Sequence, residues 1–178
     1  MRERETVTSE RLQEFMKVLG DRLTLPTRVF FVGGSTAVLL GWRNATIDID
    51  LKVLPDSDEA LQLFATLKDR LDVNIELASP DDFIPALPGW EARSLFIAQV
   101  GKVTFLHYDF YAQALAKIER GHDFDLSDVD HLVKEGLIDP GKLRELFSQI
   151  EDQLFRYPAV NPEVFRRAVE LVVSEAGQ

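Results

Sequence analysis

A strictly alternating segment, Thr46–Val53, places the strongest constraint on how this chain can fold. Its apolar positions are Ile47, Ile49, Leu51 and Val53, and the charged positions between them are Asp48, Asp50 and Lys52. Because successive side chains of a β-strand point to opposite faces, this pattern predicts a strand with one buried face and one polar face. The two aspartates therefore share the polar face.

The neighbouring segments carry the signals of further strands and helices. Short β-branched or aromatic runs predict strands, and apolar residues at helical spacing predict helices. The predicted strands are 28–32, 46–53, 73–77, 93–100 and 103–107, the last two as a hairpin around Gly101-Lys102. The predicted helices are 9–19, 36–40, 58–71, 110–120, 127–135, 141–155 and 163–175, and in 58–71 the inward residues are Leu61, Phe64, Ala65, Leu67 and Leu71. The fold class is α+β: an α+β core over residues 1–108, followed by a helical C-terminal region, 109–178, packed on it.

The composition excludes several kinds of protein. With 178 residues, of which 46% are hydrophobic, the chain can build a core, so global disorder is excluded. No cysteine is present, which excludes disulfides, thiolate zinc sites and cysteine nucleophiles. A formal net charge of -10 argues against binding of duplex DNA. We find neither a signal peptide nor an apolar stretch long enough for a bilayer, so we expect a cytoplasmic protein with no membrane partner.

The turn Gly33-Gly34-Ser35 lies between a predicted strand and a predicted helix. Two glycines let backbone amides approach a ligand, and a helix N-terminus offers N–H groups with a partial positive charge. The Ser35 hydroxyl either caps the helix or donates a hydrogen bond to a phosphate oxygen. The alternative interpretation is a turn that only connects two elements.

The pair Asp48-x-Asp50 is the second chemical feature of the chain. Side chains at i and i+2 of a strand lie roughly 7 Å apart on one face, and two such carboxylates repel unless water or a divalent cation lies between them. Mg²⁺ suits them because it prefers hard oxygen ligands and keeps positions for water and phosphate. The alternative is an ordinary solvent-facing strand. Arg43, in the return loop between the two motifs, either faces phosphate or is an exposed loop residue.

Both motifs together resemble a known superfamily. Val32-Gly33-Gly34-Ser35-Thr36-Ala37 followed by Thr46-Ile47-Asp48-Ile49-Asp50-Leu51 is similar to the motif of the polymerase β-like nucleotidyltransferases. The match looks closest to bacterial DUF6036-type nucleotidyltransferases, relatives of the AbiEii toxin group. A later segment, Ala116-Lys117-Ile118-Glu119-Arg120-Gly121 with Asp123, Asp125 and Asp128, resembles a motif of that group, so the resemblance covers about residues 29–137.

The resemblance implies a nucleotidyltransferase-fold mixed sheet with flanking helices and a catalytic site that uses Mg²⁺ (or Mn²⁺) and an NTP. Asp48 and Asp50 would bind the metal and act in catalysis, while Gly33, Gly34, Ser35 and Arg43 would bind the nucleotide. The superfamily has a third carboxylate on a later strand, and Glu76 is our candidate, with Asp72 and Asp82 as weaker alternatives. Lys117 and Arg120 would also contact the nucleotide; Asp125 and Asp128 are expected to cap the next helix, or else to anchor these two cations.

The resemblance also implies a reaction, the transfer of NMP from an NTP to an RNA (tRNA) or protein acceptor. It further implies a role as the toxin of a toxin–antitoxin system, with an antitoxin protein as partner. Two alternatives remain open at this point. One is a catalytically weak or inactive binding module that keeps the fold. The other is a nucleotidyltransferase for small molecules of the aminoglycoside type, because an acidic protein attracts polycations.

Overall fold

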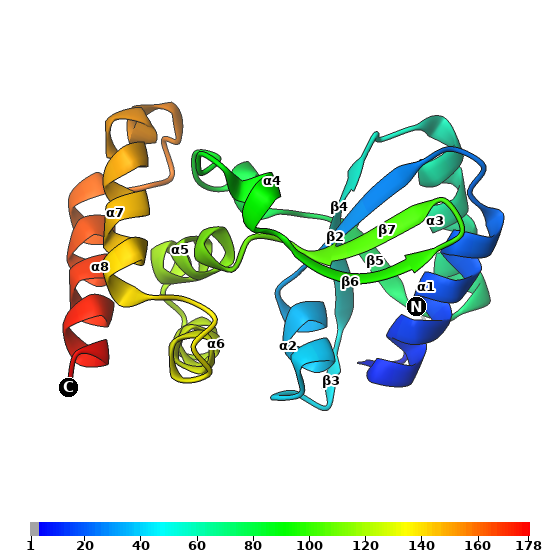
Figure 1. Ribbon diagram of the computed structural model, residues 1–178, viewed down its shortest axis with the longest axis horizontal. Helices are drawn as coiled ribbons and strands as arrows, with labels where there is room; N and C mark the ends of the chain where they lie inside the picture. The colour runs from blue at the N-terminus through cyan, green and yellow to red at the C-terminus, as the bar shows by residue number, and fades with distance from the viewer. Residues whose placement is uncertain (1–3) are drawn as a thin grey trace. The chain divides into compact units, whose positions relative to one another are not determined.

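The computed structural model describes residues 4–178, which form two units (Figure 1). The N-terminal unit consists of the residues up to Ser79 together with Ser94–Tyr108, and it contains the whole sheet. The C-terminal unit consists of Pro80–Arg93 and Asp109–Gln178 and is helical.

A five-stranded mixed sheet, in the order β5-β4-β2-β7-β6, forms the centre of the N-terminal unit. Its strands are β2 (Thr27–Val32), β4 (Asp48–Leu54), β5 (Asn74–Leu77), β6 (Leu95–Val100) and β7 (Val103–His107). Strand β2 runs antiparallel to β4 and parallel to β7, β5 runs parallel to β4, and β6 and β7 form the predicted hairpin. The predicted α+β class with a mixed sheet and a helical C-terminal region is confirmed.

Helices cover the apolar face of this sheet. They are α1 (Ser9–Arg22), α2 (Gly34–Leu40) and α3 (Asp58–Arg70). Phe15 of α1 lies at the centre of the core, with its ring centroid 6.1 Å from that of Phe31 and 6.2 Å from that of Phe64. Ile49 and Leu51 of β4 belong to the same core. Burial of such side chains stabilises the fold by about 1.5–3 kcal/mol each, and it fixes the opposite face of β4 as the polar face.

The polar face of β4 follows the prediction, but the strand begins later than predicted. Residues Ala45–Thr46 form a separate strand, β3, which pairs with β1 (Val7–Thr8) in a two-stranded sheet. Ile47 lies between β3 and β4 and is 75% exposed, so its predicted burial is wrong. The physical reason is that the chain changes pairing partner at Ile47, from β1 to the main sheet, and the alternation of burial starts only at Asp48.

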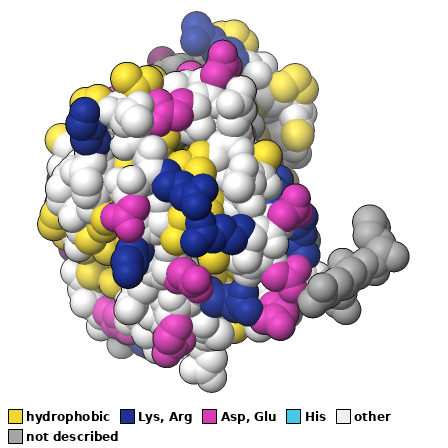
Figure 2. Space-filling view, turned by 90° about the vertical axis from the view of Figure 1, so that its right-hand side faces the viewer, with side chains coloured by type: hydrophobic (Ala, Val, Ile, Leu, Met, Phe, Trp, Pro, Cys, Tyr) yellow, Lys and Arg dark blue, Asp and Glu magenta, His cyan; other side chains and the backbone are white. Residues whose placement is uncertain are grey.

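Two helix predictions in this unit also need correction. Helix α2 begins at Gly34 with Gly33 as its N-cap and no side-chain cap, so Ser35 does not cap it. In α3 the side chains of Leu61 and Ala65 are exposed, because the buried stripe runs through Ala60, Phe64 and Leu67 instead. The side of the molecule on which α1 and α3 lie carries charged groups of both signs, with lysine and arginine side chains near its centre (Figure 2).

The C-terminal unit is built from four main helices. They are α5 (Phe110–Arg120), α6 (Asp123–Lys134), α7 (Pro140–Ile150) and α8 (Pro162–Ala176), with the short elements η1 (Pro80–Asp82), α4 (Trp90–Arg93) and η2 (Glu151–Arg156). Phe147 of α7 and Phe165 of α8 contact edge to face at 4.8 Å between ring centroids. Helix α6 begins earlier than the predicted residue 127. No helix in the described part of the chain combines the length and the hydropathy that a membrane crossing requires.

Candidate metal and phosphate site

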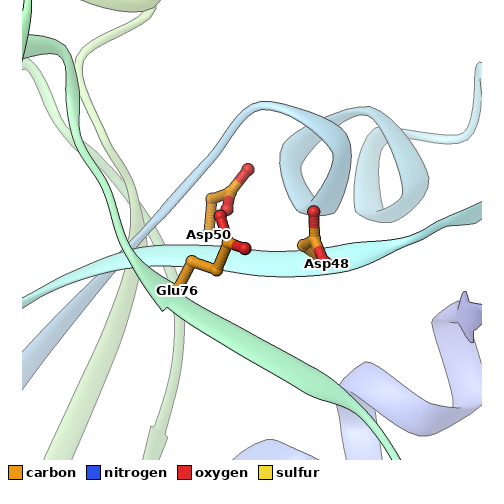
Figure 3. Close-up of side chains that lie close together, drawn as sticks. All are labelled: Asp48, Asp50 and Glu76. Carbon is orange, nitrogen blue, oxygen red and sulfur yellow. The ribbon is translucent and has the colours of Figure 1, made fainter. Parts of the chain in front are cut away.

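Three carboxylates lie together on the polar face of the sheet. Asp48 and Asp50 come from β4 and Glu76 from β5, and one oxygen of each lies within 4.8 Å of the others (Figure 3). The register explains this grouping, because Asp50 pairs with Glu76 in the parallel ladder and Asp48 lies two residues earlier on the same face. The aspartates are half-buried and Glu76 is exposed. Among the described residues, the weaker alternatives Asp72 and Asp82 do not belong to this group of carboxylates.

The glycine turn lies directly beside this group. Gly33 has φ of 61°, a conformation that favours glycine, and a Cβ placed there would lie 3.7 Å from Asp50 Oδ2. A Cβ on Gly34 would collide with Thr46 Oγ1 and lie 2.7 Å from Thr46 Cβ. The turn is therefore held against both β3 and the carboxylate of Asp50, and only glycine fits at position 34. The two motifs that the sequence separates are adjacent in space.

Ser35 follows this turn and is completely buried. Its Oγ has no hydrogen-bond partner among the residues that the structure describes. A buried hydroxyl without a partner costs about 1–3 kcal/mol, so such groups usually have a function. Because the hydroxyl is not used as a helix cap, its donor remains available for a ligand oxygen.

Arg43 approaches the same turn from the loop between α2 and β3. Its Nη1 would lie 3.4 Å from a Cβ on Gly34, so the guanidinium group lies at the glycine turn. A guanidinium group is a bidentate donor to phosphate. The contact of Arg43 with a nucleotide stays a prediction.

Lys117 and Arg120 belong to α5 of the C-terminal unit, where both bind carboxylates of α6. Lys117 Nζ lies 2.8 Å from Asp128 Oδ2, and Arg120 Nε donates to Asp125 Oδ2 over 2.8 Å. Burial raises the pKa of Asp125, but the hydrogen bond and charge of Arg120 and the charge of Lys117 outweigh it, and the pKa lies below its ordinary value. The nucleotide contacts predicted for Lys117 and Arg120 stay predictions.

The same network corrects the expectation for Asp125 and Asp128. Neither residue caps a helix, because α6 begins at Asp123 with His122 at its N-cap. Both aspartates lie inside the helix, where they are buried against the cations of α5. The observed contacts agree with the alternative expectation from the sequence, that the two aspartates anchor Lys117 and Arg120.

One residue that contacts the carboxylate group, Asn74, was not among the predicted site residues. Asn74 donates hydrogen bonds from Nδ2 to Asp48 Oδ1 over 2.6 Å and to Glu76 Oε1 over 3.0 Å. The signal was present, since Asn74 shares the polar face of its strand with Glu76. The cross-strand pairing of Asp48 with Asn74, which creates the contact, lies outside any local pattern.

The donor set fits a hard divalent cation. All three grouped side chains are carboxylates, and no sulfur or imidazole is part of the group. Mg²⁺ and Mn²⁺ prefer oxygen ligands of this kind, and Mg²⁺ is commonly bound by one or two carboxylates plus substrate phosphates. Gly33 lies beside Asp50 of this group, and phosphate binding by the Gly33-Gly34-Ser35 turn stays a prediction.

Comparison with known proteins gives the family. One solved structure, "Crystal structure of an antigenic nucleotidyltransferase-like protein from Paracoccidioides brasiliensis", matches with a TM-score of 0.52 at 16% identity and covers 93% of this chain and 95% of that chain. At this identity the likeness shows the fold alone. No curated protein matches the chain. The model of the family described as "Nucleotidyltransferase of unknown function (DUF6036)" matches residues 9–166. The chain therefore belongs to the DUF6036 family of nucleotidyltransferases.

Proposed function

We propose that this protein transfers a nucleoside monophosphate from an NTP to a hydroxyl group of an RNA or protein acceptor, with Mg²⁺ or Mn²⁺ bound by Asp48, Asp50 and Glu76. The observation that carries the proposal is the group of three carboxylates within 4.8 Å, beside the Gly33-Gly34-Ser35 turn. Three carboxylates repel phosphate unless a cation is bound, so a phosphate site beside them requires a bound cation.

The residues of the proposed site have different roles in the reaction. The backbone at Gly33 and Gly34 and the Ser35 hydroxyl bind phosphate oxygens of the NTP, and Arg43 adds positive charge there. The acceptor oxygen attacks the α-phosphorus, the bond to the β-phosphate breaks, and pyrophosphate leaves; the hydroxyl proton passes to water or to a carboxylate oxygen of the group. When bound, the cation supplies positive charge that stabilises the transition state and the leaving group.

The acceptor class rests on the sequence resemblance, and so does a role as the toxin that an antitoxin protein neutralises. Nucleotide contacts by Lys117 and Arg120 belong to the same proposal. One observation favours a second candidate, transfer to a cationic small molecule of the aminoglycoside type. The chain has 30 acidic and 20 basic residues, and its net charge of -10 attracts polycations.

The decisive experiment measures label transfer. The protein is incubated with Mg²⁺ and each α-labelled NTP in the presence of total RNA, a protein extract or an aminoglycoside. We expect transfer to RNA or protein, and a loss of at least about 100-fold in Asp48→Ala and Asp50→Ala, because several kcal/mol of transition-state stabilisation disappear. Glu14→Ala, an exposed acidic residue of α1, is the matched control and retains activity.

Each outcome has a distinct meaning. Transfer to the aminoglycoside alone would select the second candidate. An NTP-induced thermal shift without transfer to any acceptor would identify a binding module that keeps the fold. Equal activity of Asp48→Ala and the wild type would disprove the assigned site.

A further inference from the structure

The side-chain amide of Asn74 lies between two of the three carboxylates. Asp48 is its cross-strand neighbour in the parallel ladder, and Glu76 is two residues further along β5 on the same face. From this position Nδ2 donates to Asp48 Oδ1 over 2.6 Å and to Glu76 Oε1 over 3.0 Å. One amide nitrogen therefore donates both to a carboxylate of β4 and to a carboxylate of β5.

The orientation of this amide follows from its neighbours. An ionised carboxylate only accepts hydrogen bonds, whereas an asparagine amide has two donors on nitrogen and an acceptor on oxygen. A flipped amide would place Oδ1 against two carboxylate oxygens and lose both hydrogen bonds. Asn74 can therefore hold both carboxylates only with its nitrogen between them.

We propose that Asn74 is a positioning residue that holds Asp48 and Glu76 in the orientation in which they bind a divalent cation. The inference rests on the proposed function, since it concerns the same metal site. Two carboxylates of like charge on neighbouring strands repel each other, and Glu76 is an exposed side chain with several rotatable bonds. The two hydrogen bonds oppose both effects before the cation binds.

The contacts of Asn74 set it apart from residues that only stabilise the sheet. Its side chain is half-buried on the polar face, while Val73 and Ile75 on either side of it belong to the apolar core. Removal of the amide therefore leaves the core packing unchanged. The expected effect is on metal affinity rather than on folding.

The experiment titrates the full chain with Mn²⁺ and follows free Mn²⁺ by electron paramagnetic resonance. We expect Asn74→Ala to raise the Kd about 10- to 100-fold, the range typical of residues that orient metal ligands. Asn74→Ser keeps one donor and is expected to give an intermediate Kd. The control is Gln99→Ala, which removes an exposed amide from the edge strand β6 and is expected to leave the Kd unchanged.

Thermal unfolding in the absence of metal separates a positioning role from a structural one. We expect Asn74→Ala and Asn74→Ser to unfold at nearly the wild-type temperature. If wild type and Asn74→Ala bind Mn²⁺ equally, the role of Asn74 is overturned and the metal site stands. If the wild type binds no Mn²⁺, the proposed function itself fails, and the inference fails with it. A lowered unfolding temperature that accounts for the whole loss of affinity would also overturn the positioning role.

Discussion

At the residue scale, His107 contacts Thr36, the residue that follows Ser35. Thr36 Oγ1 donates to the carbonyl oxygen of Phe31 over 3.3 Å and lies 3.0 Å from His107 Nδ1. The hydroxyl and the ring nitrogen are within hydrogen-bond distance of each other. This buried contact ties the start of α2, and with it the glycine turn, to the end of β7.

The burial of His107 makes the stability of the fold dependent on pH. Burial lowers the pKa of His107 from 6.5 to about 4, so between these values the unfolded state binds more protons than the folded state. The free energy of unfolding therefore falls as the pH decreases from about 6.5 to about 4, by up to about 3 kcal/mol from this group.

We expect His107→Asn to flatten this dependence, because the asparagine side chain is polar and does not titrate. Urea unfolding of the variant and the wild type at pH 7, 5.5 and 4.5 measures it. His122 is exposed, so His122→Asn is the control. Parallel curves for wild type and His107→Asn would show that another group controls the pH dependence.

At the scale of elements, residues 4–11, here called the N-terminal strap, contact the segments that precede the two strands that carry the carboxylates. Strand β1 pairs with β3 immediately before Asp48. Arg4 Nη1 donates to the carbonyl oxygen of Val73 over 2.5 Å, and Arg11 Nη1 donates to that of Leu71. The strap therefore contacts the segments that precede β4 and β5, the strands that carry Asp48 and Glu76.

We expect the double variant Arg4→Ala, Arg11→Ala to lower the free energy of unfolding by about 1–3 kcal/mol, since the two hydrogen bonds to backbone carbonyl oxygens are lost. The ion pairs of Arg4 with Asp69 and of Arg11 with Glu5, which involve exposed carboxylates, are lost as well and contribute little. We also expect a several-fold increase in the Kd for Mn²⁺. Hydrogen exchange at β4 and β5 reports the local loosening. Arg22→Ala removes an exposed arginine from the end of α1 and serves as the control. Unchanged exchange at both strands would contradict a role of the strap.

The strap also shows where prediction from the sequence reaches its limit. The alternation around Asp48 and Asp50 is local, and it predicted correctly that both aspartates share one face. Glu76 was placed on a strand by the same local pattern, but its position beside Asp50 depends on the parallel register of β4 and β5. The exposure of Ile47 and the bridge made by Asn74 depend on pairings between distant segments, which no local pattern contains.

At the scale of the whole molecule, the predicted ligand groups are divided between two units. The carboxylates and the glycine turn belong to the N-terminal unit, whereas Lys117 and Arg120 belong to the C-terminal unit. Within that unit Lys117 forms an ion pair with Asp128, and Arg120 forms one with Asp125. The proposed metal binding therefore concerns the N-terminal unit, and the proposed nucleotide contacts of Lys117 and Arg120 concern the C-terminal unit.

Hydrogen exchange with Mn²⁺ alone, and with Mn²⁺ plus an NTP, tests the metal binding and the nucleotide contacts separately. We expect Mn²⁺ alone to slow exchange in β4, β5 and the start of α2, because binding to the folded state stabilises the elements that carry the ligands. We expect Mn²⁺ with a non-hydrolysable NTP to slow exchange in α5 as well. Protection confined to the N-terminal unit under both conditions would remove Lys117 and Arg120 from the nucleotide site. The variant Asp50→Ala, which is expected to show neither effect, controls for non-specific binding.

The third carboxylate is carried by an edge strand of four residues, β5, and not by the centre of the sheet. Strands at an edge tolerate sequence drift, because fewer neighbours depend on them. Glu76 is exposed there, so its replacement would leave the folded core almost untouched. A single substitution at Glu76 would therefore remove a carboxylate of the proposed metal site while the architecture of the sheet persists.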